Sequence, residues 1–342
     1  MDEGLPGFIR WLETPAGKVP SISTELRPAD RLGSWKARWV IGRMSYLVPP
    51  GLYAVGDPGP ADPVLVTANY RMSYDIVRQS LAGRNVWLLV LETCGINVWC
   101  AAGKGTFGTD ELVGRIAATR LGDVVSRREI FLPILGAAGV AAHEVRTRSG
   151  FTVRYATLRA ADIPAFLDNG MTATPAMGEL TFTVMERLVL IPVELVAAAR
   201  VSAPVVLVLL LGGWRGAGEF SLFRLLEPVL AYLGSVLAGC VVTPLLLPWL
   251  PTRSFAVKGG VAGLAWAAVW FWLAGGEWWN ASTTAASFLL LPAVAAFLAL
   301  NFTGSTPFTS RSGVKKEMRL ALPVMVTALL VGSILLVMGR FS

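Results

Sequence analysis

Cys100 is the residue of this sequence whose type and position most directly suggest chemistry. It stands three residues after Asn97, and asparagine is a favoured N-cap residue of helices. The positive end of a helix dipole favours a thiolate, and a thiolate is a ligand for soft metal ions. On spacing alone, a buried structural cysteine explains the same residue, because free cysteine is among the most buried residue types.

Thr67 is expected to lie near Cys100 although it is distant in the chain. Residues 63–67 and 85–91 are apolar runs rich in valine and leucine, which predict two buried strands. Thr67 ends the first run, and residues 92–100 follow the second. Ligands of open α/β sheets bind at the carboxyl ends of strands, and consecutive strands are usually neighbours. The two loops are therefore expected to face one crevice.

The elements that would position these loops alternate between strand and helix. Further strands are expected at residues 130–133 and 151–155, and helical stretches at 72–81, 97–118, 137–145 and 161–168. This alternation is typical of a parallel sheet covered on both faces, so the fold class is an α/β Rossmann-like head. Residues 1–60 are rich in proline and glycine, and we expect them to be irregular and to wrap that core.

Other candidate ligands have ordinary alternatives. The three cysteines form no CxxC pair, so a disulfide framework is not expected. Cys94 is either a second metal-binding thiol or a strand-end cysteine, and Cys240 either relays metal or is a small buried residue. His143 lies outside the D-x-H-x-x-G pattern of histidine-ligated cobalamin, because Ala141 and Arg146 occupy the other positions. We expect an ordinary surface or core histidine.

Gly103, Gly105 and Gly108 spell G-x-G-x-x-G. A dinucleotide-binding fingerprint should follow a strand immediately, whereas about ten residues separate Gly103 from the strand end at Leu91. Close approach to a ligand or helix packing explains these glycines equally well. A Walker A loop is excluded, because Val98 stands where its first glycine is required.

The second part of the chain has the composition of membrane-spanning helices. Apolar residues make up 54% of the 342 residues and charged residues only 15%, against about a quarter charged in soluble domains. A span needs about 20 apolar residues. We expect an all-α transmembrane bundle of about five helices, at residues 188–211, 228–250, 259–275, 283–301 and 320–338. The expected domains are a head of residues 1–182 and a transmembrane domain of residues 183–342.

The distribution of positive charge between the loops predicts how these spans are oriented in the membrane. Residues 188–211 contain Glu194 and Arg200 and could instead lie along the interface. If they span, most loop cations share a side with the head, as the positive-inside rule requires. We therefore expect Glu194 and Arg200 to face the bundle interior. The head side then holds Arg253, Lys258, Arg311, Lys315, Lys316 and Arg319, and the other side holds Arg215, Arg224 and Arg340.

The net charge of the chain and its N-terminal sequence also bear on the expected localisation. We assign the net charge of +7 to topology and not to nucleic-acid binding. Gly259 and Gly263 form a GxxxG that would allow close helix contact. Residues 1–6 show neither the basic nor the apolar region of a signal peptide. We expect a multi-pass protein of the cytoplasmic (inner) membrane, with its head in the reducing cytoplasm.

Residues 97–104 read Asn-Val-Trp-Cys-Ala-Ala-Gly-Lys. This octapeptide resembles the signature of the mercury-methylating corrinoid protein family (HgcA), and the similarity continues through residue 109. Upstream segments resemble the corrinoid domain of the corrinoid iron–sulfur protein, and two C-terminal segments resemble the mercury-methylating family. These segments are residues 23–26, 30–33, 41–44, 50–56, 301–307 and 312–318.

The resemblance implies a cobalamin-type corrinoid, bound base-off, with Cys100 as the lower axial ligand of cobalt. Asn97 would steady the sulfur, and Thr67 would approach the cobalt from the other side. Because a corrin ring supplies four equatorial nitrogens, one protein ligand suffices. The other residues implied to bind the cofactor are Val98, Trp99, Ala101, Ala102, Gly103 and Lys104.

The implied activity is that of a corrinoid-dependent methyltransferase, which moves a methyl group from methyl-Co(III) corrinoid to Hg(II) and gives methylmercury. The sequence has no C-x2-C-x2-C motif for an iron–sulfur cluster. The implied partners are a ferredoxin-like protein with two [4Fe–4S] clusters and a methyl-folate-linked methyltransferase. Two alternatives stay open. One is a corrinoid methyl carrier of one-carbon metabolism with mercury incidental, and the other is a membrane transporter with a ligand-binding head.

Overall fold

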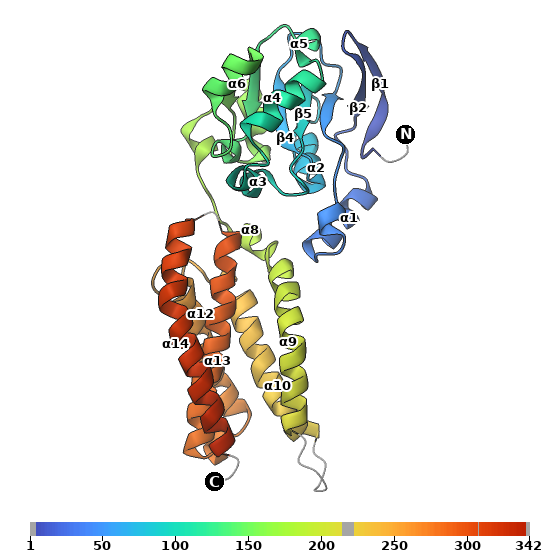
Figure 1. The fold of residues 1–342 in the computed structure, drawn as a ribbon. Helices are drawn as coiled ribbons and strands as arrows, with labels where there is room; N and C mark the ends of the chain where they lie inside the picture. The colour runs from blue at the N-terminus through green and yellow to red at the C-terminus, as the bar shows by residue number, and fades with distance from the viewer. Residues whose placement is uncertain (1–4, 214–221, 307, 340–342) are drawn as a thin grey trace. The chain divides into compact units, whose positions relative to one another are not determined.

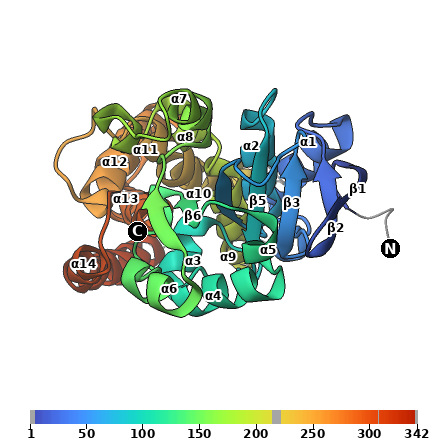
Figure 2. The same ribbon diagram turned by 90° about the horizontal axis from the view of Figure 1, so that it is seen from above.

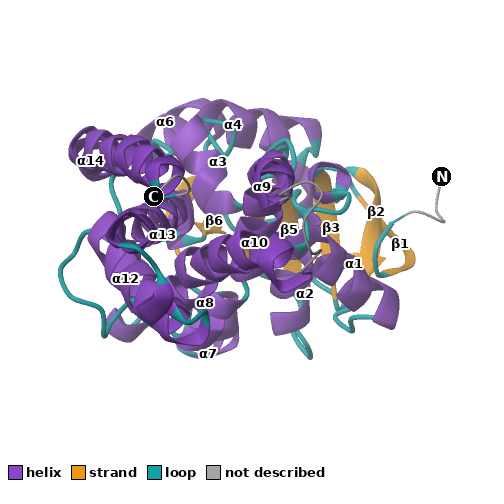
Figure 3. Cartoon of the chain, turned by 90° about the horizontal axis from the view of Figure 1, so that it is seen from below, coloured by secondary structure: helices purple, strands orange, loops and turns teal. Residues whose placement is uncertain are grey.

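The computed structural model describes residues 5–213, 222–306 and 308–339. Arg215 and Arg340 of the predicted topology, and residues 1–4 of the N-terminus, lie outside these ranges. The chain divides into two compact units, Met1–Leu180 and Thr181–Ser342, and the division falls two residues before the expected boundary. Among the described residues, strands occur only in the first unit (Figure 3).

The first unit is an α/β domain (Figure 1). Its strands are β1 (Phe8–Thr14), β2 (Gly17–Ile22), β3 (Gly51–Val55), β4 (Val64–Ala68), β5 (Val86–Leu91), β6 (Glu129–Leu132) and β7 (Thr152–Tyr155). Its α-helices are α1 (Pro28–Arg38), α2 (Arg71–Ser80), α3 (Val98–Lys104), α4 (Thr109–Ala118), α5 (Leu121–Val124), α6 (Ala142–Ser149) and α7 (Ile163–Asp168).

The seven strands form one mixed sheet in the order β1-β2-β3-β5-β4-β6-β7. Strands β5, β4, β6 and β7 run parallel, as expected. The expectation of an all-parallel sheet is wrong, because β3 pairs antiparallel with β5 and β1 forms an antiparallel hairpin with β2.

The expectation that residues 1–60 are irregular is also wrong, since they supply three strands and α1. Strand β1 lies at the sheet edge with most of its residues exposed. Strand β1 carries charged side chains and β2 contains Pro20. For this reason the alternation of apolar and polar residues that predicts a strand is not visible in their sequence. Gly17 reverses the chain between them at φ +111°, a conformation that favours glycine.

Helices cover both faces of the sheet (Figure 2). On one face α4 and α6 pack against the strands through Leu112, Ile116 and Val145. On the other face α2 and α7 contribute Tyr74 and Phe166. All residues of β4 and β5 are buried, which is the pattern of strands covered on both sides.

Two helical segments differ from the sequence prediction. The stretch 97–118 is two helices, because α3 ends at Gly105 with φ +84°. The helix expected at 137–145 begins only at Ala142, after a 3₁₀ turn, η2 (Ile134–Gly136). A Cβ atom added at Gly139 would stand 2.1 Å from the carbonyl oxygen of Phe107. The chain at Gly139 therefore packs directly against Phe107 and Ala102, where a side chain would not fit.

The second unit is helical. Its α-helices are α8 (Val184–Leu188), α9 (Ile191–Gly213), α10 (Leu222–Leu237), α11 (Thr243–Leu245), α12 (Phe255–Leu273), α13 (Ala281–Asn301) and α14 (Arg311–Met338), and a π-helical turn spans Ala238–Val242. Five helical segments are long and apolar enough to cross a membrane. They are Val184–Gly212, Leu225–Leu245, Phe255–Leu273, Ala281–Ser305 and Ser312–Met338.

Packing within this unit tests two predictions. Gly259 and Gly263 are buried, and a Cβ atom at either would stand within 3 Å of α13 atoms, so the close contact predicted for this GxxxG is confirmed. Glu194 is partly buried and accepts a hydrogen bond from the Ser305 hydroxyl at 2.7 Å. Arg200 is exposed, so its expected interior position is wrong. Six residues rotate a helix by about 240°, so Glu194 and Arg200 cannot share a face.

Candidate functional site

The loops that follow β4 and β5 lie at the same edge of the sheet, as predicted. The two strands are parallel neighbours, with Thr67 opposite Val90 and Ala68 opposite Leu91. Their carboxyl ends therefore leave the sheet side by side. Thr67 is the last residue but one of β4, which ends at Ala68 shortly before α2, and the loop after β5 leads into α3.

Cys100 lies in the first turn of α3, and Asn97 is the N-cap residue of that helix. The side-chain oxygen of Asn97 accepts a hydrogen bond from the Cys100 backbone N–H at 3.0 Å. The predicted N-cap is thereby confirmed, and it orients the backbone of Cys100. The thiol is free and the residue is partly exposed.

A pocket of about 240 Å³ opens beside the start of α3. Most of its lining is apolar, with side chains from β4, α2, β6 and the segments around residues 133–135 and 156–163. Four of the predicted site residues line this pocket: Thr67, Asn97, Val98 and Trp99. The structure thus brings residues from both predicted loops together around one hollow.

The other predicted site residues do not line this pocket. Ala101 and Ala102 are buried in the core beneath α3. Gly103 and Lys104 are exposed at the end of the helix. Cys100 does not line the pocket either; it follows Trp99, which does, and it is partly exposed.

Asn69 holds the two loops together, and the sequence analysis assigned it no role. Its side-chain oxygen accepts hydrogen bonds from the N–H and the hydroxyl of Thr93 at 3.0 and 2.9 Å. Its amide nitrogen donates to Oε1 of Glu92 at 2.8 Å. Both Asn69 and Thr93 are fully buried. The sequence offered one sign of this role. Asn69 directly follows a strand that is buried throughout, and a buried side-chain amide requires hydrogen-bond partners.

Replacing Asn69 with leucine should loosen the loop that leads into Cys100. The buried N–H of Thr93 would lose its acceptor, which costs about 1–3 kcal/mol. We expect that loss in the unfolding free energy of the first unit, measured by proteolysis of the full-length protein in a urea series. The exposed Asn85, which accepts the Asp57 N–H at 3.0 Å, is the matched control. Equal losses for Asn69→Leu and Asn85→Leu would contradict the assigned role.

Cys94 lies in the same loop, where it is exposed. Its backbone is in the left-handed region at φ +54°, and its N–H donates to Oε1 of Glu92 at 2.7 Å. The strand-end position is therefore confirmed, and a metal-binding role stays untested. His143 is exposed on α6, as expected of a surface histidine.

The three glycines of G-x-G-x-x-G lie outside a strand-to-helix turn. Gly103 is inside α3, Gly105 ends that helix, and Gly108 is the N-cap residue of α4. The arrangement agrees with the prediction that this motif does not bind a dinucleotide. A Cβ atom at Gly103 would meet no atom within 4 Å, so this face of α3 is open.

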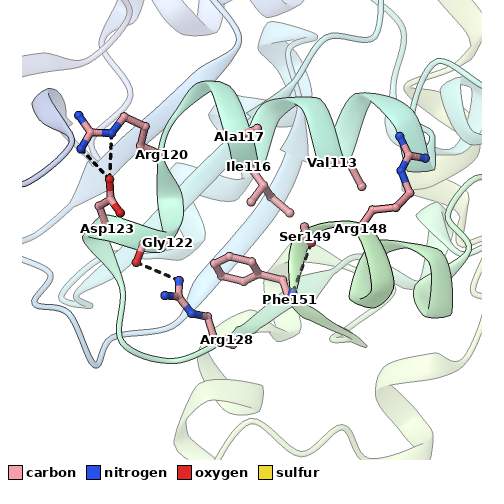
Figure 4. A pocket seen from close by; sticks show the side chains of 10 residues that line it. All are labelled: Val113, Ile116, Ala117, Arg120, Gly122, Asp123, Arg128, Arg148, Ser149 and Phe151. Carbon is pink, nitrogen blue, oxygen red and sulfur yellow. Dashed lines mark hydrogen bonds and ion pairs between the residues drawn. The ribbon is translucent and has the colours of Figure 1, made fainter.

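A larger hollow, of about 480 Å³, lies at the opposite edge of the sheet (Figure 4). It is lined by residues that precede β6 and β7, such as Arg128 and Phe151, together with residues of α4 and α5. None of the predicted site residues contributes to it. Its three arginines already have partners. Arg120 pairs with Asp123 at 2.7 Å, Arg148 pairs with Asp110 at 2.6 Å, and Arg128 donates to the Gly122 carbonyl oxygen at 2.9 Å. We therefore place the candidate site at the Cys100 edge.

The fold and the site define an α/β domain with a cysteine-bearing helix and an apolar pocket at the carboxyl edge of its sheet. Residues 42–167 match the family model of the CO dehydrogenase/acetyl-CoA synthase delta subunit. The matched segment lies within the first unit and includes β3 to β7 and α3.

Relatives point to the same kind of complex. The acetyl-CoA decarbonylase/synthase complex subunit gamma of Methanopyrus kandleri is 33% identical over 123 residues, which cover 35% of this chain and 26% of the relative. The corresponding subunit of Archaeoglobus fulgidus is 37% identical over 92 residues, covering 26% and 20%. That of Methanocaldococcus jannaschii is 31% identical over 129 residues, covering 37% and 26%. The chain thus spans about a quarter of these relatives, and none of their names concerns mercury.

Proposed function

We propose that this protein is a corrinoid-binding methyl carrier, with the cofactor held against α3 and Cys100 as its protein ligand. The observation that carries the proposal is the position of the Cys100 thiol. The thiol is free and partly exposed. The Cys100 backbone N–H is held by Asn97, which lines an apolar pocket at the carboxyl edge of β4 and β5. The match to acetyl-CoA synthase subunits supports this role, and it favours one-carbon metabolism over mercury as the setting.

The residues of this edge fit such a cofactor. Among the described residues, no group of three or more histidine, cysteine or acidic side chains could hold a metal ion. A single thiolate suits a metal that brings its other ligands with it, and soft sulfur is a suitable donor to cobalt. The pocket accommodates only part of a macrocycle, while the open face at Gly103 leaves room for close approach.

The chain's own residues would bind and orient the group. A bound corrinoid would supply a methyl group on cobalt. Asn97 fixes the backbone that carries the Cys100 sulfur. Thr67 and Trp99 border the hollow, where they would limit the access of water to a bound group. As with the relatives, we infer partner proteins. We propose a ferredoxin-like electron donor and a methyl-folate-linked methyltransferase.

The spectrum of bound corrinoid tests this proposal. The full-length protein, purified in detergent, should bind methylcobalamin in a one-to-one ratio with the absorbance of a base-off, sulfur-ligated cobalt. Cys100→Ala should shift that spectrum, because the sulfur ligand is lost, whereas Cys94→Ala should leave it unchanged. An identical spectrum for Cys100→Ala would rule out thiolate ligation.

Mercury(II) is a second candidate, as the methyl acceptor of the same site. The residue type at position 100 favours it, because a cysteine thiolate as ligand would donate more electron density to a metal than an imidazole does. An electrophilic acceptor such as Hg(II) requires a methyl group with carbanion or radical character. A corrinoid-dependent mercury methyltransferase would therefore use the Cys100 sulfur to activate the methyl group.

We further propose that the second unit spans the cytoplasmic membrane, with the first unit in the cytoplasm. The support is the five long apolar helices. The transporter alternative needs ionisable side chains along a path through the bundle. Glu194 is hydrogen-bonded to Ser305, and Arg200 is exposed, so these two do not line one path. We favour an anchoring role.

A further inference from the structure

Two cations of the second unit converge on one turn of the chain. The turn follows α11 and includes Leu247 and Trp249. Lys258, from the first turns of α12, donates a hydrogen bond from Nζ to the carbonyl oxygen of Leu247. Arg187, from α8, lies over the ring of Trp249 with its guanidinium carbon 5.8 Å from the ring centroid. Both cations therefore contact the same turn of the chain.

Arg187 is buried with unused hydrogen-bonding capacity. The residue is only 2% exposed. Its Nε donates to the carbonyl oxygen of Thr183 at 3.3 Å, but its Nη1 is buried without a hydrogen-bond partner. A buried guanidinium normally uses its planar fork of donors on an acidic group. The free nitrogen therefore indicates that a partner outside the protein completes this site.

No acidic side chain supplies the missing partner. Within the part of the chain that the structure describes, neither Arg187 nor Lys258 forms an ion pair with a carboxylate. Glu186 accepts the Thr183 N–H at 2.6 Å in a capping box. Glu317 accepts from the Ser254 hydroxyl at 2.7 Å and the Ala256 N–H at 2.8 Å, at the start of α12.

A bound anion would offset the electrostatic repulsion between Arg187 and Lys258. Two like charges held on one turn without a counter-ion repel each other, and the burial of Arg187 removes water that would screen its charge. A phosphate group offers several charged oxygens, so it can accept from the Arg187 fork and from Lys258 at once. A single carbonyl or hydroxyl oxygen would leave the repulsion in place.

The position of the pair indicates where the phosphate comes from. Arg187 and Lys258 stand near the starts of the first and third candidate spans, and the turn follows the end of the second. Trp249 is 70% exposed, and exposed tryptophans are typical of the level of lipid headgroups. Three further cations at the starts of α12 and α14 are exposed: Arg253, Lys315 and Lys316. Basic residues at this level attract anionic lipids.

We propose that Arg187 and Lys258 form a binding site for the phosphate of an anionic lipid headgroup. The inference rests on the proposed insertion of the second unit in a membrane, and it is independent of corrinoid binding by the first unit. The bound phosphate would tie α8 to the start of α12.

Lipid titration of the full-length protein tests this site. The delipidated protein in detergent would be titrated with phosphatidylglycerol, phosphatidylcholine or inorganic phosphate, with binding followed by native mass spectrometry and by thermal unfolding. We expect one tightly retained phosphatidylglycerol that raises the unfolding temperature. Lys258→Gln should weaken its binding by about 10-fold or more, as expected for loss of a charge-assisted hydrogen bond. Arg187→Gln should do the same, and the exposed Arg253→Gln should not.

Each other outcome would overturn the proposal. If inorganic phosphate binds as tightly as the lipid and depends equally on Lys258, the site takes free phosphate and the lipid assignment is wrong. If Lys258→Gln and Arg253→Gln bind phosphatidylglycerol like the unaltered protein, no specific site exists. Should Arg187→Gln fail to fold, Lys258→Gln decides alone, because Lys258 is only partly buried. The corrinoid spectrum of the same samples is a separate readout, so failure here leaves the proposed function testable.

Discussion

If Hg(II) is a methyl acceptor of the proposed corrinoid site, replacing Cys100 with histidine should preserve corrinoid binding but lower methylmercury formation by about 100-fold or more. A loss of that size corresponds to about 2.7 kcal/mol of transition-state stabilisation. Histidine still ligates cobalt, so the cofactor is retained. Imidazole donates less electron density than thiolate, so the transferred methyl group is less able to attack electrophilic Hg(II). The measurement is single-turnover methylmercury formation by the full-length protein loaded with methylcobalamin.

The control for this prediction is a nucleophilic methyl acceptor. Transfer to a simple thiol requires the methyl group as a cation equivalent, so Cys100→His should not slow it to the same extent. Loss of both activities together would indicate a damaged cofactor site instead of a changed methyl group. Full methylmercury formation by Cys100→His would show that the ligand type is not what makes mercury an acceptor, and the one-carbon role would then stand alone.

Local sequence signals predicted the centre of the candidate site. Asn97 caps a helix because its short side chain reaches the N–H three residues on, which is a property of the local chain. Thr67 and the β5 loop meet because parallel strands β4 and β5 are neighbours, which is the usual arrangement of consecutive strands. Both inferences required only short-range rules, and both describe the structure.

The sequence did not predict the roles of residues whose hydrogen-bond partners lie far away in the chain. Asn69 bonds to Thr93, 24 residues on, and Arg78 bonds to Asp30, 48 residues back. No periodicity marks such pairs. Strand β3 likewise became part of the sheet through antiparallel pairing with β5, which local propensity does not encode. In the second unit, hydropathy predicted the long apolar helices, but the direction of Arg200 depended on helix rotation and not on average composition.

Arg78 connects the N-terminal segments of the first unit to α2. It is fully buried. Its Nε donates to Asp75 at 2.7 Å and its Nη2 to Asp30 at 2.9 Å. Its Nη1 donates to the carbonyl oxygens of Ser23 and Glu25 at 2.7 and 2.9 Å. One guanidinium therefore fixes the segment before α1 against the helix whose Ser73, Ile76 and Val77 line the pocket.

Replacing Arg78 with methionine should destabilise the first unit by about 3–5 kcal/mol, because two buried carboxylates lose one of their two cations and keep only Arg71. Proteolysis of the full-length protein in a urea series measures the loss. The matched control is Arg84→Met, which removes an ion pair with Asp168 whose side chains are 34% and 57% exposed. An exposed pair of this kind contributes about 0–1 kcal/mol. Similar losses for the two variants would mean that the buried network does not hold α1 to α2.

Acid should narrow the difference between the Arg78→Met variant and the unaltered protein. Burial alone would raise the pKa of Asp30, but the Arg27 backbone N–H and the Arg78 and Arg71 guanidiniums outweigh burial and lower it. A carboxyl group with a lowered pKa stabilises the fold above its unfolded pKa of about 3.9, and that contribution is lost as the pH falls through the folded value. In Arg78→Met much of this stabilisation is already absent. The gap in unfolding free energy should therefore be largest at neutral pH and shrink towards pH 3, and a gap that stays constant would show that Asp30 and Arg78 do not act as an ion pair.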